Sequence, residues 1–156
     1  YADGRDKAIA WMNSTANGHP VVPRSCYIVE FNALWYNAIK FCASQEAEFG
    51  DKKLADKLEK LSEVTKQSFI ETFLNEYGYL LDYVDGNMMD WSVRPNMIFP
   101  VAFDYSPLNQ EQKKSVLDVC TRELLTPKGL RSLSPKSGGY NPMYVGQQTQ
   151  RDYAYH

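Results

Sequence analysis

The apolar residues that follow Val29 are spaced so that they cover nearly every face of a helix. They are Phe31, Ala33, Leu34, Trp35, Ala38, Ile39, Phe41 and Cys42. A helix that is apolar on nearly all sides is a buried one, so we predict a buried helix over residues 29–44. Trp35 is accordingly expected in the core rather than on a binding surface.

A second helix is predicted over residues 52–74, directly after a break at Gly50. One of its faces carries residues that lie three or four positions apart, namely Leu54, Leu58, Leu61, Thr65, Phe69 and Phe73. Lysine and glutamate fill the other side, and this pattern is typical of an amphipathic helix at a protein surface. The two segments together predict a hairpin of one inner and one outer helix.

The same succession of an inner and an outer helix is predicted in the second half of the chain. Arg94-Pro95-Asn96 opens an apolar run. Because proline suits the first turn of a helix, we expect a short inner helix over residues 95–103. Asn109 is a suitable cap for an amphipathic outer helix over residues 109–124, and Gly129 is expected to mark its C-terminal side.

Long loops are predicted to connect and flank these helices. Residues 1–27 contain the turn signal Asn17-Gly18 and two prolines, and residues 132–156 are rich in glycine and polar residues. The alternation over residues 79–84 is compatible with one short strand before the turn at Asp85-Gly86. The expected fold class is therefore all-α with long loops.

Composition and charge are typical of a globular domain and exclude several classes of function. The 156 residues suit one domain, with 44% hydrophobic and 23% charged residues. The net charge of -2 leaves no basic excess for phosphate contacts, so no nucleic-acid partner is expected. No apolar run approaches the roughly 20 residues of a membrane helix, so no membrane partner is expected. The aromatic fraction of 13% predicts that some rings line a binding surface.

The cysteines and histidines do not form the pattern of a metal or redox site. The chain has three cysteines, an odd number, and they are widely spaced: Cys26, Cys42 and Cys120. This pattern argues against a disulfide framework and favours a reducing, cytoplasmic location. His19 and His156 are far apart in the sequence, so we expect neither a metal site nor a cofactor. The chain does not begin with methionine, and we therefore expect a processed or excised piece of a longer protein.

Several blocks of sequence occur in an order that is shared with one family. They are Trp11-Met12-Asn13, Val22-Pro23-Arg24, Glu30-Phe31-Asn32-Ala33-Leu34-Trp35-Tyr36, Arg94-Pro95-Asn96, Tyr140-Asn141-Pro142 and Arg151-Asp152-Tyr153-Ala154-Tyr155-His156. In this order they resemble the glucosidase domain of glycogen debranching enzymes, over the whole chain. The blocks around Asn32 and Arg151 are the specific ones, whereas Arg-Pro-Asn alone is a weak motif.

The resemblance implies a fold and a reaction. The fold is an (α/α)6 barrel, in which six helical hairpins surround a sugar pocket. Residues 1–156 are then expected to be part of one such barrel domain, truncated at both ends and completed by the remainder of the parent chain. The implied reaction is the hydrolysis of α-1,6-linked branch glucose in glycogen or another branched α-glucan, with inversion.

An inverting glycosidase needs one carboxyl group as the general acid and a second that activates water. The resemblance places the acid after Trp11-Met12, where the family usually has aspartate and this chain has Asn13. An amide cannot supply the proton, so either another carboxylate acts or the activity is altered or lost. Glu30, at the start of a buried helix, is the nearest carboxylate that can replace the missing acid. The equally weighted alternative is that Glu30 only caps the first turn of this helix. The second carboxylate is expected beyond His156.

Further residues are expected to bind the sugar, because charged, amide and aromatic groups together suit its hydroxyls and its apolar ring faces. They are Trp11, Asn32, Arg94, Asn96, Arg151, Asp152, Tyr155 and His156. The alternative for Arg94 and Asn96 is a purely structural role, as a salt bridge and a helix cap. A loop clamped by an interaction between Arg151 and Asp152 is the alternative for the last block.

Two other functions remain open from the sequence. Another (α/α)6 glucosidase of the trehalase type also carries an Asn-Ala segment on an inner helix, but such enzymes normally retain the aspartate that is replaced by Asn13. A non-catalytic glycan-binding or helical interaction module is favoured by Asn13 and disfavoured by the number of matching blocks.

Overall fold

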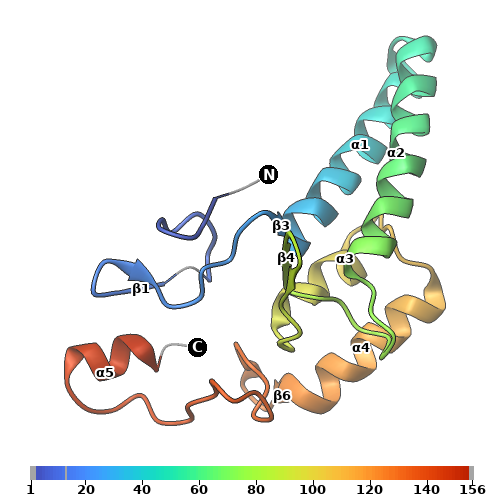
Figure 1. Ribbon diagram of the computed structural model, residues 1–156. Helices are drawn as coiled ribbons and strands as arrows, with labels where there is room; N and C mark the ends of the chain where they lie inside the picture. Colours follow the sequence, from blue (N-terminus) through green and yellow to red (C-terminus); the bar gives the residue numbers. More distant parts are fainter. Residues whose placement is uncertain (1–2, 13, 155–156) are drawn as a thin grey trace.

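The computed structural model describes residues 3–12 and 14–154 of the chain. A long hairpin of two helices, α1 (Val29–Phe49) and α2 (Lys52–Phe73), extends from a body that contains α3 (Phe99–Ala102) and α4 (Gln110–Leu124). Figure 1 shows the N-terminal segment and α5 (Gln148–Tyr153) on the other side of this body. Among the described residues, no helix combines the length and the apolar character that a membrane span requires.

The α1–α2 hairpin confirms the two helices predicted over residues 29–44 and 52–74. The carboxylate of Asp51 caps α2 by accepting a hydrogen bond from the backbone N–H of Lys53 at 2.8 Å. The N–H of Gly50 donates to the carbonyl of Glu46 and closes α1 at its C-terminal end. The break predicted at Gly50 is therefore a tight helix–helix turn, and α1 extends to Phe49 because nothing earlier in the sequence stops it.

The helix α1 is buried on one side only, which corrects the expectation of a helix covered all round. Ala33, Tyr36 and Ile39 are buried, whereas Leu34 and Trp35 are exposed, Trp35 to 56%. The core position predicted for Trp35 is therefore wrong. Among the described elements, α1 packs mainly against α2, with smaller contacts to α3 and the 3-10 helix η1 (Pro95–Ile98), and these cover a single face.

In the second half of the chain, the structure confirms the helix predicted over residues 109–124 and refines the one predicted over residues 95–103. The segment predicted as a helix over residues 95–103 begins as η1 and continues as one turn of α-helix in α3. The Asn109 side chain accepts from the backbone N–H of Gln112, and the Gln112 side chain accepts from the N–H of Asn109. This reciprocal cap starts α4 at the predicted position.

The core lies where the base of the hairpin meets α4. Its members are buried side chains from α1, α2, η1 and α4 and from the loop between α2 and η1, including Val29, Phe73, Leu80, Met97, Val116 and Leu124. The apolar face predicted for α4 thus packs against the base of the first hairpin.

Short strands correct the all-α expectation, although about half of the chain is helical. β1 (Thr15–Ala16) pairs with β2 (His19–Pro20), and β6 (Leu125–Thr126) pairs with β7 (Gly129–Leu130). Gly129 has a φ of 130° in this second hairpin. The helix α4 ends at Leu124 and leads directly into β6. Gly129, predicted to mark the C-terminal side of α4, therefore belongs to the β6–β7 hairpin.

A third small sheet joins the entrance of α1 to the chain after α2. β3 (Tyr27–Ile28) pairs with β4 (Tyr83–Asp85), which pairs with β5 (Met88–Met89), all antiparallel. The β4–β5 turn contains the predicted Asp85-Gly86. The ring of six hairpins that the resemblance implies is not formed by the described residues alone.

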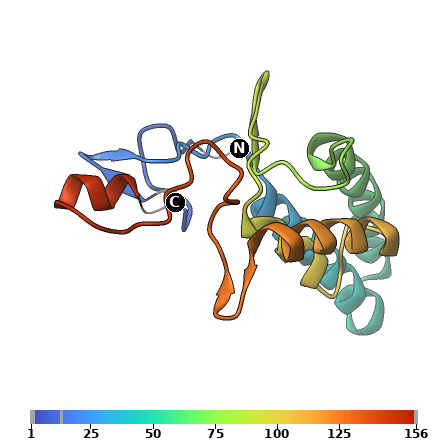
Figure 2. The same cartoon turned by 90° about the horizontal axis from the view of Figure 1, so that it is seen from below.

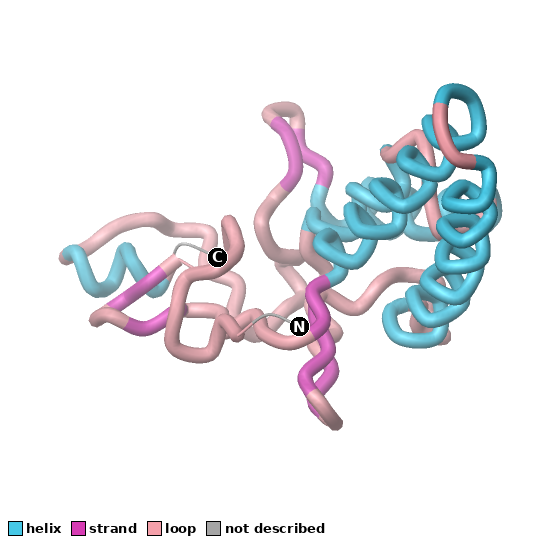
Figure 3. Tube along the Cα trace, turned by 90° about the horizontal axis from the view of Figure 1, so that it is seen from above, coloured by secondary structure: helices cyan, strands magenta, loops and turns pink. Residues whose placement is uncertain are grey.

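The N-terminal and C-terminal segments lie together, apart from the helical hairpin. The helix α5 contacts β1, and the views from below and from above show both on one side of the molecule (Figures 2 and 3). The sequence predicted this region as loops only, and α5 is too short and too polar to show helical periodicity.

Candidate functional site

A buried network of charged side chains lies where the N-terminal segment reaches the body. Arg24 is at its centre and has no exposed surface. Its guanidinium donates to both carboxylate oxygens of Glu30, Nη1 to Oε1 at 2.7 Å and Nη2 to Oε2 at 2.6 Å. It also donates to both oxygens of Asp82, Nε to Oδ2 at 2.7 Å and Nη2 to Oδ1 at 3.0 Å. One guanidinium thus binds two carboxylates, each through paired hydrogen bonds.

The pairing of β3 with β4 places the two carboxylates on either side of Arg24. Ile28 lies opposite Tyr83, and the backbone N–H of Val29 donates to the carbonyl of Asp82 at 3.1 Å. Glu30 is in the first turn of α1 and Asp82 comes just before β4, so this register brings residues 52 positions apart into one cluster. The short sheet therefore has a direct role in forming the network.

Asn96 and Arg94 extend the network from the start of η1. The amide Nδ2 of Asn96 donates to Asp82 Oδ1 at 2.6 Å and contacts the sulfur of Met12 at 3.0 Å. Arg94 Nε lies 3.7 Å from Asp82 Oδ2. Within the described part of the chain, Arg94 Nε and Nη1 and Asn96 Oδ1 are buried without a hydrogen-bond partner.

The electrostatics of the network follow from its burial. Burial raises the pKa of Asp82 above its ordinary value, while the charge of Arg24, the amide of Asn96 and the charge of Arg94 act in the opposite direction. Burial alone would lower the pKa of Arg24, but its hydrogen bond with Glu30 and the charges of Asp82 and Glu30 raise it. Two cations and two carboxylates thus compensate one another in an almost wholly buried site.

The structure brings together three of the residues that the sequence predicted for the site. Glu30, Arg94 and Asn96 are all buried members of the network. Trp11 is 56% exposed and directly precedes Met12, which contacts Asn96. The predicted acid position Asn13 follows Met12 and lies outside the described residues.

Asn32 lies elsewhere. Its side-chain amide donates to the carbonyl of Ile28 at 2.8 Å. It lines a groove of about 420 Å³ between α1 and α2, together with Tyr27, Trp35 and Thr65. The side chains of Glu30 and Asn32 therefore lie on different sides of the first turn of α1.

Two of the predicted residues of the last block, Arg151 and Asp152, lie on α5. Arg151 Nη2 donates to Gln148 Oε1 at 3.3 Å, and Gln148 Nε2 donates to Asp152 Oδ1 at 2.6 Å. Both side chains thus contact Gln148, one turn earlier in the helix. Tyr155 and His156 lie outside the described residues.

Sequence reasoning missed the two residues that hold the network together, Arg24 and Asp82. Arg24 belongs to one of the blocks that resemble the debranching enzymes, but its position in a loop gave no sign of complete burial. Asp82 had a usable signal, because a lone aspartate within the apolar run Tyr79–Val84 is buried only when it is paired. Among residues 3–12 and 14–154, no cluster of histidine, cysteine, aspartate and glutamate is arranged as a metal site.

Comparison with known protein families gives a match over the full length of the chain. The family model described as amylo-alpha-1,6-glucosidase matches residues 1–156, the whole chain. No curated protein matches the sequence. The family match agrees with the resemblance read from the sequence blocks.

Proposed function

The chain belongs to the amylo-alpha-1,6-glucosidase family, and from this premise we propose that it forms part of a glycoside hydrolase that removes α-1,6-linked branch glucose. The substrate in this proposal is glycogen or another branched α-glucan. The match of all 156 residues to the family is the observation that carries it.

The buried network supports a positioning role for Glu30 and Arg24. Both oxygens of Glu30 accept hydrogen bonds from Arg24, and the residue is only 3% exposed. A general acid must reach the glycosidic oxygen with its proton, so these contacts favour Glu30 as a residue that fixes the segment before α1. The catalytic role predicted for Glu30 stays a prediction.

Arg94 and Asn96 are proposed to bind sugar hydroxyls. Their buried atoms without hydrogen-bond partners comprise two donors on Arg94 and one acceptor on Asn96. Leaving such atoms unpaired costs about 1–3 kcal/mol each, and a hydroxyl satisfies either type because it both donates and accepts. Asn96 also contacts Met12, the neighbour of Asn13 in the sequence.

The other predicted sugar-binding residues remain in the proposal: Trp11, Asn32, Arg151, Asp152, Tyr155 and His156. The parent chain is proposed to supply further helices that complete the barrel and a carboxylate that activates water. The apolar side of α1 supports this, because Phe31, Leu34, Trp35 and Phe41 are exposed along one stripe. A reducing, cytoplasmic location belongs to the proposal and is supported by the three free cysteines.

The test is glucose release from a branched limit dextrin by the full-length parent protein. We compare the wild type with Asn13→Asp, and use Asn17→Asp, an exposed turn residue, as the matched control. Restoring a carboxyl at the acid position is expected to raise turnover, because general acid catalysis typically contributes about 10²–10⁴-fold. Wild-type activity that is abolished by Asn13→Asp would instead show that the acid lies elsewhere and that Asn13 positions it. Absence of glucose release from every one of these proteins contradicts the proposed activity.

The second candidate is a glycan-binding protein without hydrolytic activity. One specific observation favours it, namely the amide of Asn13 where the family usually has a carboxyl group. Binding of the limit dextrin without glucose release, in both the wild type and Asn13→Asp, would select this candidate.

A further inference from the structure

A second cleft, far in the sequence from Glu30 and Asn13, combines exposed aromatic rings with charged side chains. Its volume is about 380 Å³. We define the aromatic cleft by six of its lining residues: Tyr77, Tyr79, Trp91, Arg122, Glu123 and Lys136. They come from the loop after α2, the segment before η1, the C-terminal end of α4 and the loop after β7.

The rings form a platform at one wall of the aromatic cleft. Tyr77 and Tyr79 are stacked, with centroids 6.5 Å apart and an interplanar angle of 21°, and Tyr77 meets Trp91 edge to face at 6.1 Å. Tyr77 is 67% exposed and Trp91 42% exposed. Rings that pack on one another and remain open to solvent offer faces on which an apolar ring surface can stack.

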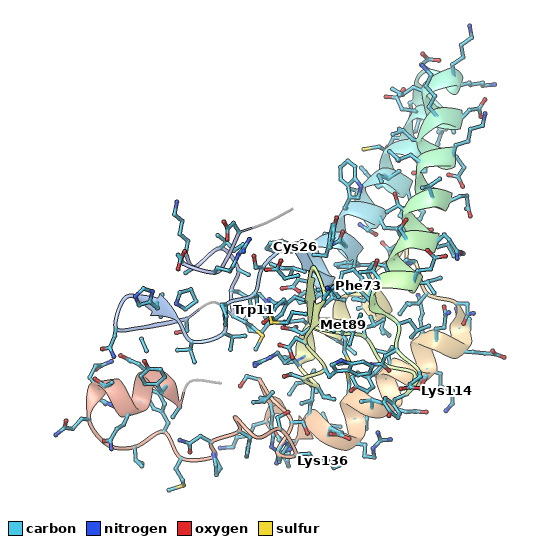
Figure 4. The ribbon with its side chains drawn as sticks, viewed as in Figure 1. Trp11, Cys26, Phe73, Met89, Lys114 and Lys136 are labelled. Carbon is cyan, nitrogen blue, oxygen red and sulfur yellow. The ribbon has the colours of Figure 1, made fainter. Side chains whose placement is uncertain are left out.

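The opposite wall carries hydrogen-bonding groups with unused capacity. Glu123 Oε2 accepts from Ser134 Oγ at 2.7 Å, and Oε1 accepts from Lys136 Nζ at 2.9 Å. Each carboxylate oxygen accepts two hydrogen bonds, and an ammonium group donates three, so both Glu123 and Lys136 can bind further groups. Lys136 is largely exposed and lies near the end of α4, at the opposite end of this helix from Lys114 (Figure 4).

The aromatic cleft is preformed because both walls are attached to the core. The Tyr79 hydroxyl donates to the carbonyl of Trp91 at 3.1 Å, which fixes the two aromatic segments to each other. The backbone N–H of Ser134 donates to the carbonyl of Val93 at 3.0 Å, which fixes the charged wall to the aromatic one. Val93 and Val119, both in the core, line its floor. Little ordering is therefore required when a ligand binds.

We infer that the aromatic cleft binds a linear α-glucan chain. A glucose ring has an apolar face that stacks on an aromatic ring, and hydroxyls at its rim that pair with carboxylate and ammonium groups. This wall combines one acceptor group, the carboxylate of Glu123, with two cationic donors, Arg122 and Lys136, and the hydroxyls of a polyol can pair with both kinds. The choice of an α-glucan rests on the proposed function, which supplies the class of ligand. The aromatic cleft would hold an unbranched part of the polymer, and its lining residue Val93 directly precedes Arg94 in the chain.

Binding of maltoheptaose to the full-length protein tests this inference by titration calorimetry, with affinity electrophoresis in glycogen-containing gels as a second readout. Tyr77→Ala and Trp91→Ala are each expected to weaken binding about tenfold or more, because each removes a stacking face. Phe49→Ala is the matched control, since it removes an exposed ring at the end of α1. Glu123→Gln is expected to weaken binding less, because an amide oxygen still accepts.

The outcomes separate this inference from the proposed function. Wild-type affinity in Tyr77→Ala and Trp91→Ala, with unchanged thermal unfolding, overturns the aromatic cleft as a glucan site. So does the absence of any maltoheptaose binding by the wild type, or an equal loss in Phe49→Ala. Glucose release from a limit dextrin is measured in parallel and tests the proposed function. Maltoheptaose contains no branch to hydrolyse, so its binding is measured independently of that activity.

Discussion

Arg24 binds Glu30 through two parallel hydrogen bonds, and this pair ties the N-terminal segment to the first turn of α1. The distances are 2.7 and 2.6 Å, and both side chains are buried. The same guanidinium binds Asp82 before β4. Arg24, together with the contact between Met12 and Asn96, therefore fixes the N-terminal segment to the helical body.

Replacing Arg24 with methionine is expected to lower the free energy of unfolding by about 3–5 kcal/mol. The substitution leaves Glu30 and Asp82 buried without their main cation, and an uncompensated buried charge is far more costly than an intact pair. Urea-induced unfolding followed by circular dichroism measures the effect. Arg24→Lys is the control, since it keeps the charge but cannot form two paired sets of hydrogen bonds. A loss below about 1 kcal/mol for Arg24→Met would contradict the assigned importance of the network.

The elements that the sequence predicted well are those set by local spacing. Apolar residues three and four positions apart gave α1, α2 and α4, and Asn109 gave the start of α4, because these signals act within a few residues. The network could not be predicted in the same way. Arg24 and Asp82 are 58 positions apart, and only the register of β3 with β4 brings them together.

The exposure of Trp35 shows a second limit of sequence reasoning. Apolar residues on every face of a helix indicate that all of its faces pack against protein. The pattern does not identify the segments that pack there. In the described chain, α2 covers only part of α1, and Trp35 stays 56% exposed at the groove between the two helices.

Asn109→Ala is expected to lower the free energy of unfolding by about 1 kcal/mol, because the N-cap of α4 loses its side-chain acceptor. The reciprocal bond between Asn109 and Gln112 is also affected. Asn109→Ser retains an acceptor oxygen and is expected to remain close to the wild type. Thermal unfolding of the three proteins compares them. Equal stability of the alanine and wild-type proteins would show that α4 is held by its packing alone.

Glu123 is expected to make stability depend on pH in the acidic range. Burial alone would raise the pKa of Glu123, but the hydrogen bonds from Ser134 and Lys136 and the charge of Lys136 lower it below its ordinary value of 4.5. A carboxyl group whose pKa is lower in the folded state stabilises the fold above its unfolded pKa, and this contribution is lost as the pH falls through the folded pKa.

Glu123→Gln is therefore expected to be less stable than the wild type at pH 7, by about 1 kcal/mol, and the difference is expected to shrink as the pH falls from the ordinary pKa of 4.5 through the lower folded-state pKa. Urea unfolding at a series of pH values measures this. Glu48→Gln, at an exposed position near the end of α1, is the matched control and is expected to follow the wild type. A difference of equal size at pH 3 and pH 7 would show that the charge of Glu123 is not responsible.

The three cysteines are expected to react with iodoacetamide at very different rates in the folded protein. Cys42 is exposed on α1, whereas Cys26 and Cys120 are buried. Burial raises the pKa of Cys120 to about 11. Because the thiolate is the reactive form, only about 0.1% of Cys120 is ionised at pH 8. Its side chain also packs in the core formed by α4 and the base of the first hairpin. Peptide mass spectrometry over time is expected to show Cys42 alkylated first and Cys120 last, and denaturation in urea is expected to bring the rates together. Alkylation of Cys120 in the folded protein as fast as that of Cys42 would show that α4 separates readily from the core.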